Sequence, residues 1–243
     1  MAERQQRLRG ARGLRTLLDR ALDAALAVQR PAVAAHVERV RRRSPDATPA
    51  QVVASLERQY LATVTAAGAA VGGAAAAPGV GTGAAIALSA GETAGFLEAS
   101  ALFTLAVAEV HGERVLDVER RRTLLLAVLV GERGPRIVQR IAGRTGQHWG
   151  TLVTEAIPLS GIRRINRVLG ASFVTRYSGR QGIIVLGRAV PFGIGAGIGA
   201  AGNAVIARSV IAGTRRAFGP APVRFAGDGR PVRRVPSERL DRP

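Results

Sequence analysis

Acidic side chains in apolar surroundings are the first candidates for chemistry in this sequence. Glu92 and Glu98 lie among Ala, Gly, Phe and Leu residues, and carboxylates in such a setting can be catalytic or bind metal. On one continuous helix Glu98, Glu109 and Glu113 would share nearly one face, but Glu98 and Glu109 would lie about 16 Å apart along the axis, too far to share an ion. We expect these acids to find arginine partners, and a hydrolase or metal enzyme that uses Glu92 or Glu98 remains one hypothesis.

The other residue types exclude several kinds of catalysis. The chain has no Cys, which removes disulfides, thiol catalysis and thiolate metal sites. It has no Lys, which removes Schiff-base chemistry and the phosphate-binding Lys of a Walker loop. His36, His111 and His148 are isolated, and no Ser/His/Asp arrangement can be proposed on spacing. We therefore predict no catalytic residue, no cofactor and no metal ligand, and expect a protein that is not an enzyme.

Two glycine motifs superficially fit a dinucleotide-binding fingerprint. The first has Gly79, Gly81 and Ala84 at the required spacing, with Glu98 downstream. That fingerprint follows a buried strand, whereas four alanines precede Pro78 here. The second motif, at residues 195–200, is followed by no acidic residue before Asp228. Neither motif is expected to bind a nucleotide.

The charge of the chain is strongly positive and uneven. All 35 basic residues are Arg, and the formal net charge is +18, with +6 in residues 1–60, zero in 61–155 and +12 in 156–243. Such a field attracts phosphate groups of anionic lipid or nucleic acid. Arginine instead of lysine is also what a GC-rich genome produces, so only the charge is interpreted. The arginines expected to meet an anionic surface are Arg163, Arg164, Arg167, Arg215 and Arg216.

Nucleic acid is the less favoured of these two partners. Aromatic residues, on which bases stack, make up only 4% of the chain. No helix-turn-helix or RNA-binding signature is present. A soluble, basic nucleic-acid-binding protein is kept as the alternative function.

Two Gly/Ala-rich stretches, nearly free of charged residues, must position these side chains. Ala and Gly make up 20 of the 31 residues in 61–91 and 11 of the 19 residues in 189–207. Small residues let helices approach closely, in a membrane or in a tight helical core. Pro78 and Pro191 interrupt the two stretches, and a proline followed by glycines permits the chain to reverse. We therefore predict two Gly/Ala-rich helical hairpins.

Helical periodicity continues along most of the remaining chain, and no strand pattern is convincing. Residues 11–28 form an amphipathic pattern, which indicates either a helix docked on the core or one lying in a lipid interface. A second helix is expected from Pro31 to Arg43, and Thr48 with Gln51 forms a capping box that starts a long helix. Further helices are expected over residues 83–110, 116–130, 136–144 and 161–176.

The predicted fold is therefore an all-α helical bundle built around the two hairpins. Its expected organisation is basic amphipathic helices in residues 1–47, a helical core in 48–218 and a disordered, basic, Pro-rich tail in 219–243. The sequence sets no oligomeric state.

Membrane insertion of the first hairpin is close to break-even. Eight large apolar residues in 84–108 contribute roughly −4 kcal/mol, against about +5 kcal/mol for Glu92 and Glu98 at mid-helix. We expect a buried or membrane-dipping hairpin rather than spanning helices. The basic start is followed by no uninterrupted apolar run, unlike a secretory signal. The expected location is the cytoplasmic side of the cell membrane, peripheral or hairpin-embedded, with the cytoplasm as the alternative.

The second Gly/Ala-rich stretch resembles the C-terminal signature of the EcsC protein family. That signature is a proline followed by Gly-rich apolar residues and an asparagine, and the matching residues here are Arg188, Pro191, Gly193, Gly195 and Asn203. Other parts of the pattern resemble Pro78, Gly79 and Gly81, then Glu92 and Glu98, so that the resemblance covers roughly residues 48–218.

The EcsC family takes its name from a gene beside an ABC-transporter pair, and no activity, cofactor or catalytic residue is established for it. The resemblance implies a membrane-associated accessory of a transport or secretion system. The implied partner is anionic membrane lipid or a membrane protein complex linked to an ABC transporter.

Overall fold

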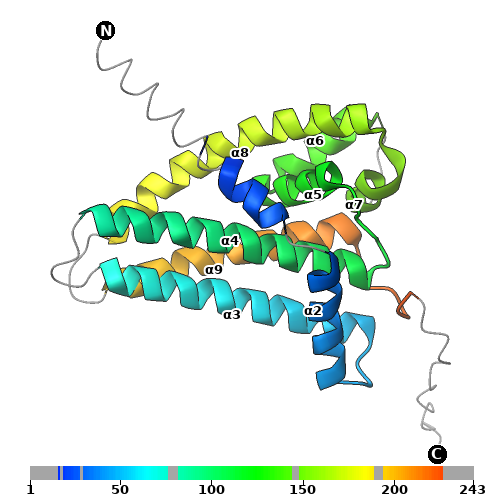
Figure 1. The fold of residues 1–243 in the computed structure, drawn as a ribbon, viewed down its shortest axis with the longest axis horizontal. Coiled ribbons are helices and arrows are strands. Elements are labelled where there is room, and N and C mark those ends of the chain that lie inside the picture. The colour runs from blue at the N-terminus through cyan, green and yellow to red at the C-terminus, as the bar shows by residue number, and fades with distance from the viewer. Residues whose placement is uncertain are drawn as a thin grey trace, which may run out of the picture.

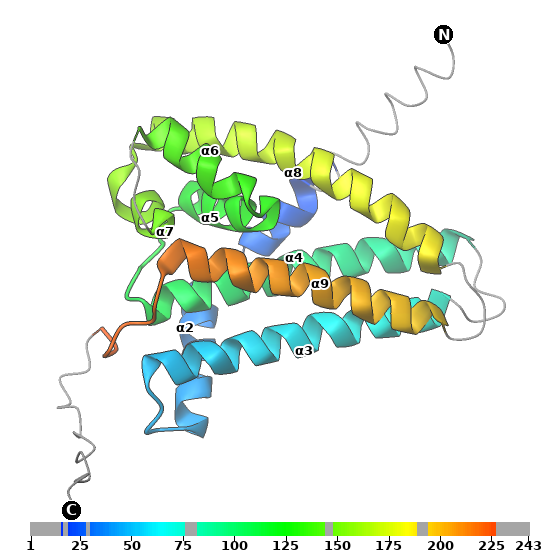
Figure 2. The same cartoon turned by 180° about the vertical axis from the view of Figure 1, so that it is seen from behind.

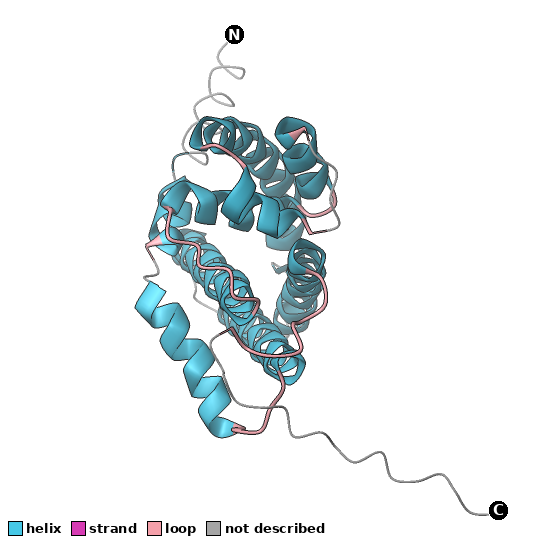
Figure 3. Cartoon of the chain, turned by 90° about the vertical axis from the view of Figure 1, so that its right-hand side faces the viewer, coloured by secondary structure: helices cyan, strands magenta, loops and turns pink. Residues whose placement is uncertain are grey.

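The structure is a computed structural model that describes Thr16 and residues 19–27, 30–75, 82–143, 148–188 and 194–226. Within these ranges all regular secondary structure is helical and no strand is present (Figure 3). The all-α prediction is confirmed.

Three long helices form the first layer of the bundle. They are α3 (Pro49–Ala75), α4 (Thr82–Val110) and α9 (Ile194–Phe218). α3 runs antiparallel to both α4 and α9 and packs along both of them (Figures 1 and 2). The C-terminal end of α3 and the N-terminal ends of α4 and α9 therefore lie together at one end of the molecule.

A second group of helices covers one side of this layer. It contains α5 (Val118–Val130), α6 (Arg133–Ala142), α7 (Trp149–Thr151), the π-helical turn η1 (Leu152–Ala156) and α8 (Leu159–Arg188). α5 packs on α8 and α6, while α2 (Arg30–Arg43) packs on α4 and α3 at the other end of the layer (Figure 1). The core is continuous across both groups, with Leu97, Leu124 and Ile162 among its fully buried side chains.

Several helix ends are set by local interactions that the sequence predicts. Thr48 N–H donates to Gln51 Oε1 at 2.8 Å and Gln51 N–H donates to Thr48 Oγ1 at 3.3 Å, which confirms the capping box. At the end of α4, Gly112 has a φ of 82° and Glu113 N–H donates to Ala108 O. A left-handed residue at this position suits glycine, because it carries no Cβ.

The N-terminal helix docks on the core where the structure describes it. Residues 19–26 are helical, and Leu22, Ala25 and Leu26 are buried. Arg122 of α5 forms ion pairs with Asp19 at 3.6 Å and Asp23 at 3.1 Å. Of the two interpretations of this amphipathic pattern, the docked helix is the one that this placement supports.

The last predicted segments differ in extent from the structure. α8 continues beyond the expected end at residue 176 to Arg188, and the short helical stretch 149–156 was not predicted. Residues 219–226 hold no helix, and Phe225 packs on the core with the Arg41 guanidinium 4.1 Å above its ring. The predicted disordered tail from residue 227 onward lies outside the described residues.

Candidate functional site

The two Gly/Ala-rich stretches meet each other along α3 and α9. A Cβ built on Gly68 would lie 2.5 Å from the Gly199 carbonyl oxygen and 2.5 Å from Asn203 Nδ2. A Cβ on Gly199 would in turn collide with the Gly68 carbonyl oxygen. The backbones of the two helices therefore approach as closely as glycine alone permits.

Asn203 lies beside this glycine contact and links three helices through its amide. Its side chain is buried, and its two Nδ2 hydrogens are donated to Val64 O at 3.0 Å and to Glu92 Oε1 at 2.8 Å. This cluster therefore joins α3, α4 and α9. One partner of Glu92 is thus the side-chain amide of Asn203. The arrangement satisfies buried polar groups and offers no nucleophile.

Glu98 does not belong to this cluster. Its side chain is exposed on α4, so the apolar neighbours in its sequence lie on other faces of the helix. A sequence context that is apolar for both acids therefore corresponds to a helix contact for Glu92 and to an exposed position for Glu98. Glu113 accepts a hydrogen bond from Thr154 Oγ1 at 2.5 Å and lies beyond the end of α4. Among the described residues, no group of three His, Asp or Glu side chains could hold a metal ion.

Several residues of the family-like pattern lie outside the described residues, namely Pro78, Gly79, Gly81, Pro191 and Gly193. Arg188 is the last residue of α8, and Gly195 lies in the first turn of α9. Among the five that the structure describes, Glu92 and Asn203 are joined by a hydrogen bond.

A second feature is a basic groove between α3 and α9, of about 550 Å³. We call it the arginine groove; its lining residues are Glu57, Arg58, Leu61, Arg208, Ile211, Ala212, Arg215 and Arg216. The predicted pair Arg215 and Arg216 is therefore joined by two arginines that the sequence analysis missed, Arg58 and Arg208. A sequence signal exists for both, because each is the charged residue that borders a charge-free stretch. Arg163, Arg164 and Arg167 are exposed on α8 and do not line this groove.

One arginine of the groove is held by a carboxylate. Arg215 Nε donates to Glu57 Oε1 at 2.6 Å and its Nη2 to Glu57 Oε2 at 2.5 Å, a two-point ion pair. This hydrogen bonding raises the pKa of the Arg215 guanidinium. The Glu57 side chain is only 10% exposed whereas that of Arg215 is 66% exposed. Arg215 therefore neutralises a buried carboxylate and is a structural member of the groove.

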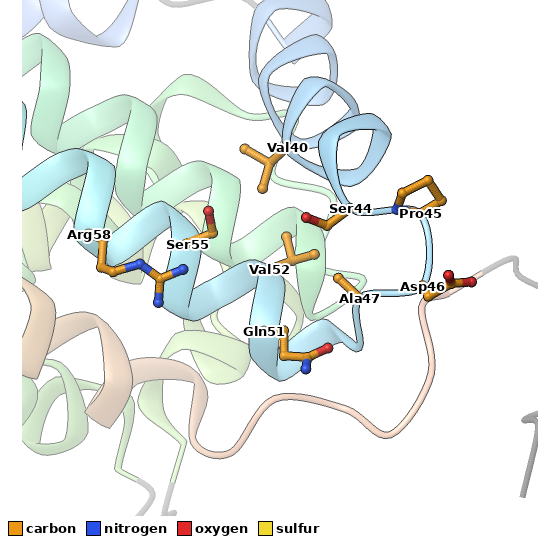
Figure 4. A pocket seen from close by; sticks show the side chains of 9 residues that line it. All are labelled: Val40, Ser44, Pro45, Asp46, Ala47, Gln51, Val52, Ser55 and Arg58. Atoms are coloured by element: carbon orange, nitrogen blue, oxygen red, sulfur yellow. The ribbon is translucent and has the colours of Figure 1, made fainter. Parts of the chain in front are cut away.

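A second hollow, of about 500 Å³, lies between the end of α2 and the start of α3 (Figure 4). Its polar walls include Ser44, Gln51, Ser55 and Arg58. Gln51 is engaged in the capping box, and Ser55 accepts a hydrogen bond from Gln59 at 3.2 Å. Arg58 lines this hollow as well as the arginine groove. Among the described residues that line it, Asp46 is the one acidic residue and there is no histidine.

The end of the bundle where the charge-free parts of α3, α4 and α9 meet is a third feature. We call this end the tip: residues 61–75 of α3, 82–91 of α4 and 194–207 of α9. Nearly all of its exposed positions are small or apolar, and those that the structure describes are Ala62, Thr63, Ala66, Ala67, Ala70, Ala87, Leu88, Ala90, Gly91, Gly197, Ala201 and Val205. α8 also ends beside the tip, at Arg188 (Figure 1).

Only one helix among the described residues is long and apolar enough to cross a membrane, the segment Ala90–Val110 of α4, and 61% of it is buried inside the bundle. Such burial is what a core helix of the bundle requires, so its apolar character has a packing explanation. No protein-family model, curated protein or solved structure matches this chain. The resemblance to the EcsC family thus stays a prediction.

Proposed function

We propose that this protein is a non-enzymatic, membrane-associated helical protein that binds the cytoplasmic side of the cell membrane through its tip. The observation that supports the proposal is the tip itself, where three helices expose Ala, Gly, Leu and Val without a charged residue. A soluble protein usually interrupts such a surface with charged side chains, and a contiguous apolar surface indicates a contact with a membrane or another protein.

The size of the tip favours dipping over spanning. Residues 61–75 of α3 extend about 22 Å at the helical rise. The hydrocarbon core of a bilayer is about 30 Å thick, so one leaflet offers about 15 Å. The tip is therefore long enough to enter one leaflet and too short to cross both.

Backbone satisfaction also suits this role. Between their ends, the helices of the tip pair their backbone groups along each helix, and the Asn203 amide donates to the Glu92 carboxylate and the Val64 carbonyl inside the bundle. The main polar cost of placing these helices in lipid would therefore fall on the unpaired backbone groups at the helix ends. The resemblance to the EcsC family adds the proposal that the membrane-bound protein assists a transport or secretion system.

The test is flotation of the full chain with phosphatidylglycerol vesicles, with a charge placed on the tip. Val205 on α9 is 62% exposed, and V205D places a carboxylate on the tip. Val223 is 85% exposed and lies beyond α9, so V223D is a control with the same change in charge. We expect V205D to bind vesicles roughly tenfold more weakly than the wild type, because this Asp would meet the anionic head groups at the boundary of the hydrocarbon. V223D should bind like the wild type.

Two results would contradict the proposal. One is a wild-type protein that stays wholly in the soluble fraction, both with vesicles and in cell extracts. The other is an equal loss of binding by V205D and V223D, which would assign the attraction to net charge alone. Retention of the wild type on membranes after alkaline carbonate would show that the tip is embedded.

A further inference from the structure

We infer that the arginine groove binds the phosphate group of an anionic lipid, and so fixes the depth and orientation of the tip in the membrane. This inference rests on the proposed membrane association and adds a defined binding site to it. The chemistry recognised is a phosphate oxyanion beside the start of an apolar chain, as in phosphatidylglycerol or phosphatidic acid.

The position of the groove along the bundle is the first argument. Arg58 and Arg208 line the groove. On α3 the tip starts at Leu61, three residues after Arg58, and on α9 the tip ends at Ala207, directly before Arg208. The groove therefore lies at the base of the tip. When the tip enters the hydrocarbon, this base comes to the level of the lipid phosphates, where arginine is favoured.

The charge of the groove is the second argument. Glu57 is the one acidic residue among the described residues that line it, and Arg215 already neutralises it with two hydrogen bonds. Within the part of the chain that the structure describes, Arg58, Arg208 and Arg216 form no ion pair or hydrogen bond through their side chains. Three guanidinium groups thus line one hollow without a counter-charge from the described part of the chain. Such planar, multiply donating groups suit a phosphate oxyanion.

The apolar wall of the groove is the third argument. Leu61 and Ile211 line it between the arginines, and both side chains are partly buried against the core. A free inorganic anion would gain nothing from this wall. A lipid presents its glycerol and first methylene groups directly beside the phosphate, so the wall favours a lipid over a small anion.

The chain offers a matched control for the arginines of the groove. The test variant is R58Q/R208Q/R216Q, which leaves the Glu57–Arg215 pair intact. The control is R163Q/R164Q/R167Q on α8, where three exposed arginines lie outside the groove. Both variants lower the net charge equally, so a difference between them measures the site rather than the field.

The experiment measures vesicle binding of the full chain to phosphatidylglycerol in phosphatidylcholine, at fixed ionic strength. We expect the groove variant to bind vesicles roughly tenfold more weakly than the α8 variant. Removing an arginine that contacts the phosphate directly weakens binding more than removing an arginine that only adds to the positive field of the protein. Inorganic phosphate and glycerol phosphate, added at equal ionic strength, should not release the wild type. The single variants R208Q and R163Q repeat the comparison if circular dichroism shows that a triple variant has not folded.

Each remaining outcome overturns the inference. Wild-type binding that the groove variant and the α8 variant reduce equally overturns the inference alone and leaves the membrane proposal standing. Release of the wild type by inorganic phosphate would assign the groove to a free anion. If the groove variant lost binding to duplex DNA and bound vesicles as the wild type does, the arginine groove would be assigned to nucleic acid. A wild type that binds no vesicle removes both the inference and the proposed function.

Discussion

His36 on α2 is a side chain whose protonation opposes folding. Partial burial lowers its pKa from the ordinary value of 6.5, and the nearby charges of Arg39 and Arg43 lower it further. The unfolded chain therefore binds a proton more readily than the folded protein does. Stability contributed by neutral His36 is present above about pH 7.5 and is lost as the pH falls through 6.5, until it levels off below the folded pKa.

This sign gives a prediction for chemical denaturation. Between about pH 8 and about pH 5 the free energy of unfolding of the wild type should fall more than that of H36Q. The free energy of unfolding of R39Q should fall by an intermediate amount, because this substitution removes one charge that repels protonated His36 and leaves His36 partly buried. The measurement is urea denaturation of the three proteins at both pH values. Equal decreases in all three would show that other groups govern the acid response.

The sequence could not predict which of the acidic side chains in apolar context finds a buried partner. The local neighbours of Glu92 and Glu98 in the sequence are equally apolar, yet Glu92 bonds to Asn203 and Glu98 is exposed. The difference is a rotation around the helix axis relative to partners far away in the chain. Asn203 lies 111 residues from Glu92, and no local pattern contains that distance.

At the scale of the helices, the close approach of α3 and α9 depends on Gly68 and Gly199, where there is no space for a side chain. G199A should destabilise the protein by about 1–3 kcal/mol, because the new Cβ meets the Gly68 carbonyl and must push the helices apart. Gly197 lies on the same helix, and a Cβ added there would meet nothing within 4 Å. G197A should therefore stabilise the helix by up to about 1 kcal/mol.

Thermal and urea unfolding of both alanine variants provide the measurement. The prediction fails if G199A is as stable as G197A, since α3 and α9 would then tolerate a side chain at the contact. G68A and G199A act on one contact, so their combined effect should be less than the sum of the two.

The elements themselves were largely predictable, and their pairing was not. Thr48, Gln51 and the prolines mark helix boundaries through interactions within one turn, so the sequence shows them directly. Gly/Ala-rich helices repeat the same small residues many times, and several registers would let two such helices approach. The sequence therefore predicted close packing but could not choose Gly68 and Gly199, or bring Arg58 and Arg208 to the groove.

The whole molecule carries a net charge of +18, and this excess opposes compaction through self-repulsion. We expect the melting temperature to rise between about 0.05 M and about 0.5 M NaCl, because salt screens the repulsion. The variant R163Q/R164Q/R167Q should show a weaker rise. A melting temperature that falls with salt would mean that ion pairs such as Glu57–Arg215 and Asp23–Arg122 outweigh the repulsion.

The pairing of α3 with α9 also sets an order of events during synthesis on the ribosome. Val64 bonds to Asn203 across 139 residues, and Glu57 bonds to Arg215 across 158. The ribosome adds roughly 5–20 residues per second, so on the order of ten seconds pass between the synthesis of α3 and that of α9, which covers its glycine face. During that interval the nascent chain presents a long, uncharged surface to chaperones and to any membrane nearby, so the synthesis of α9 decides when this face of α3 is covered.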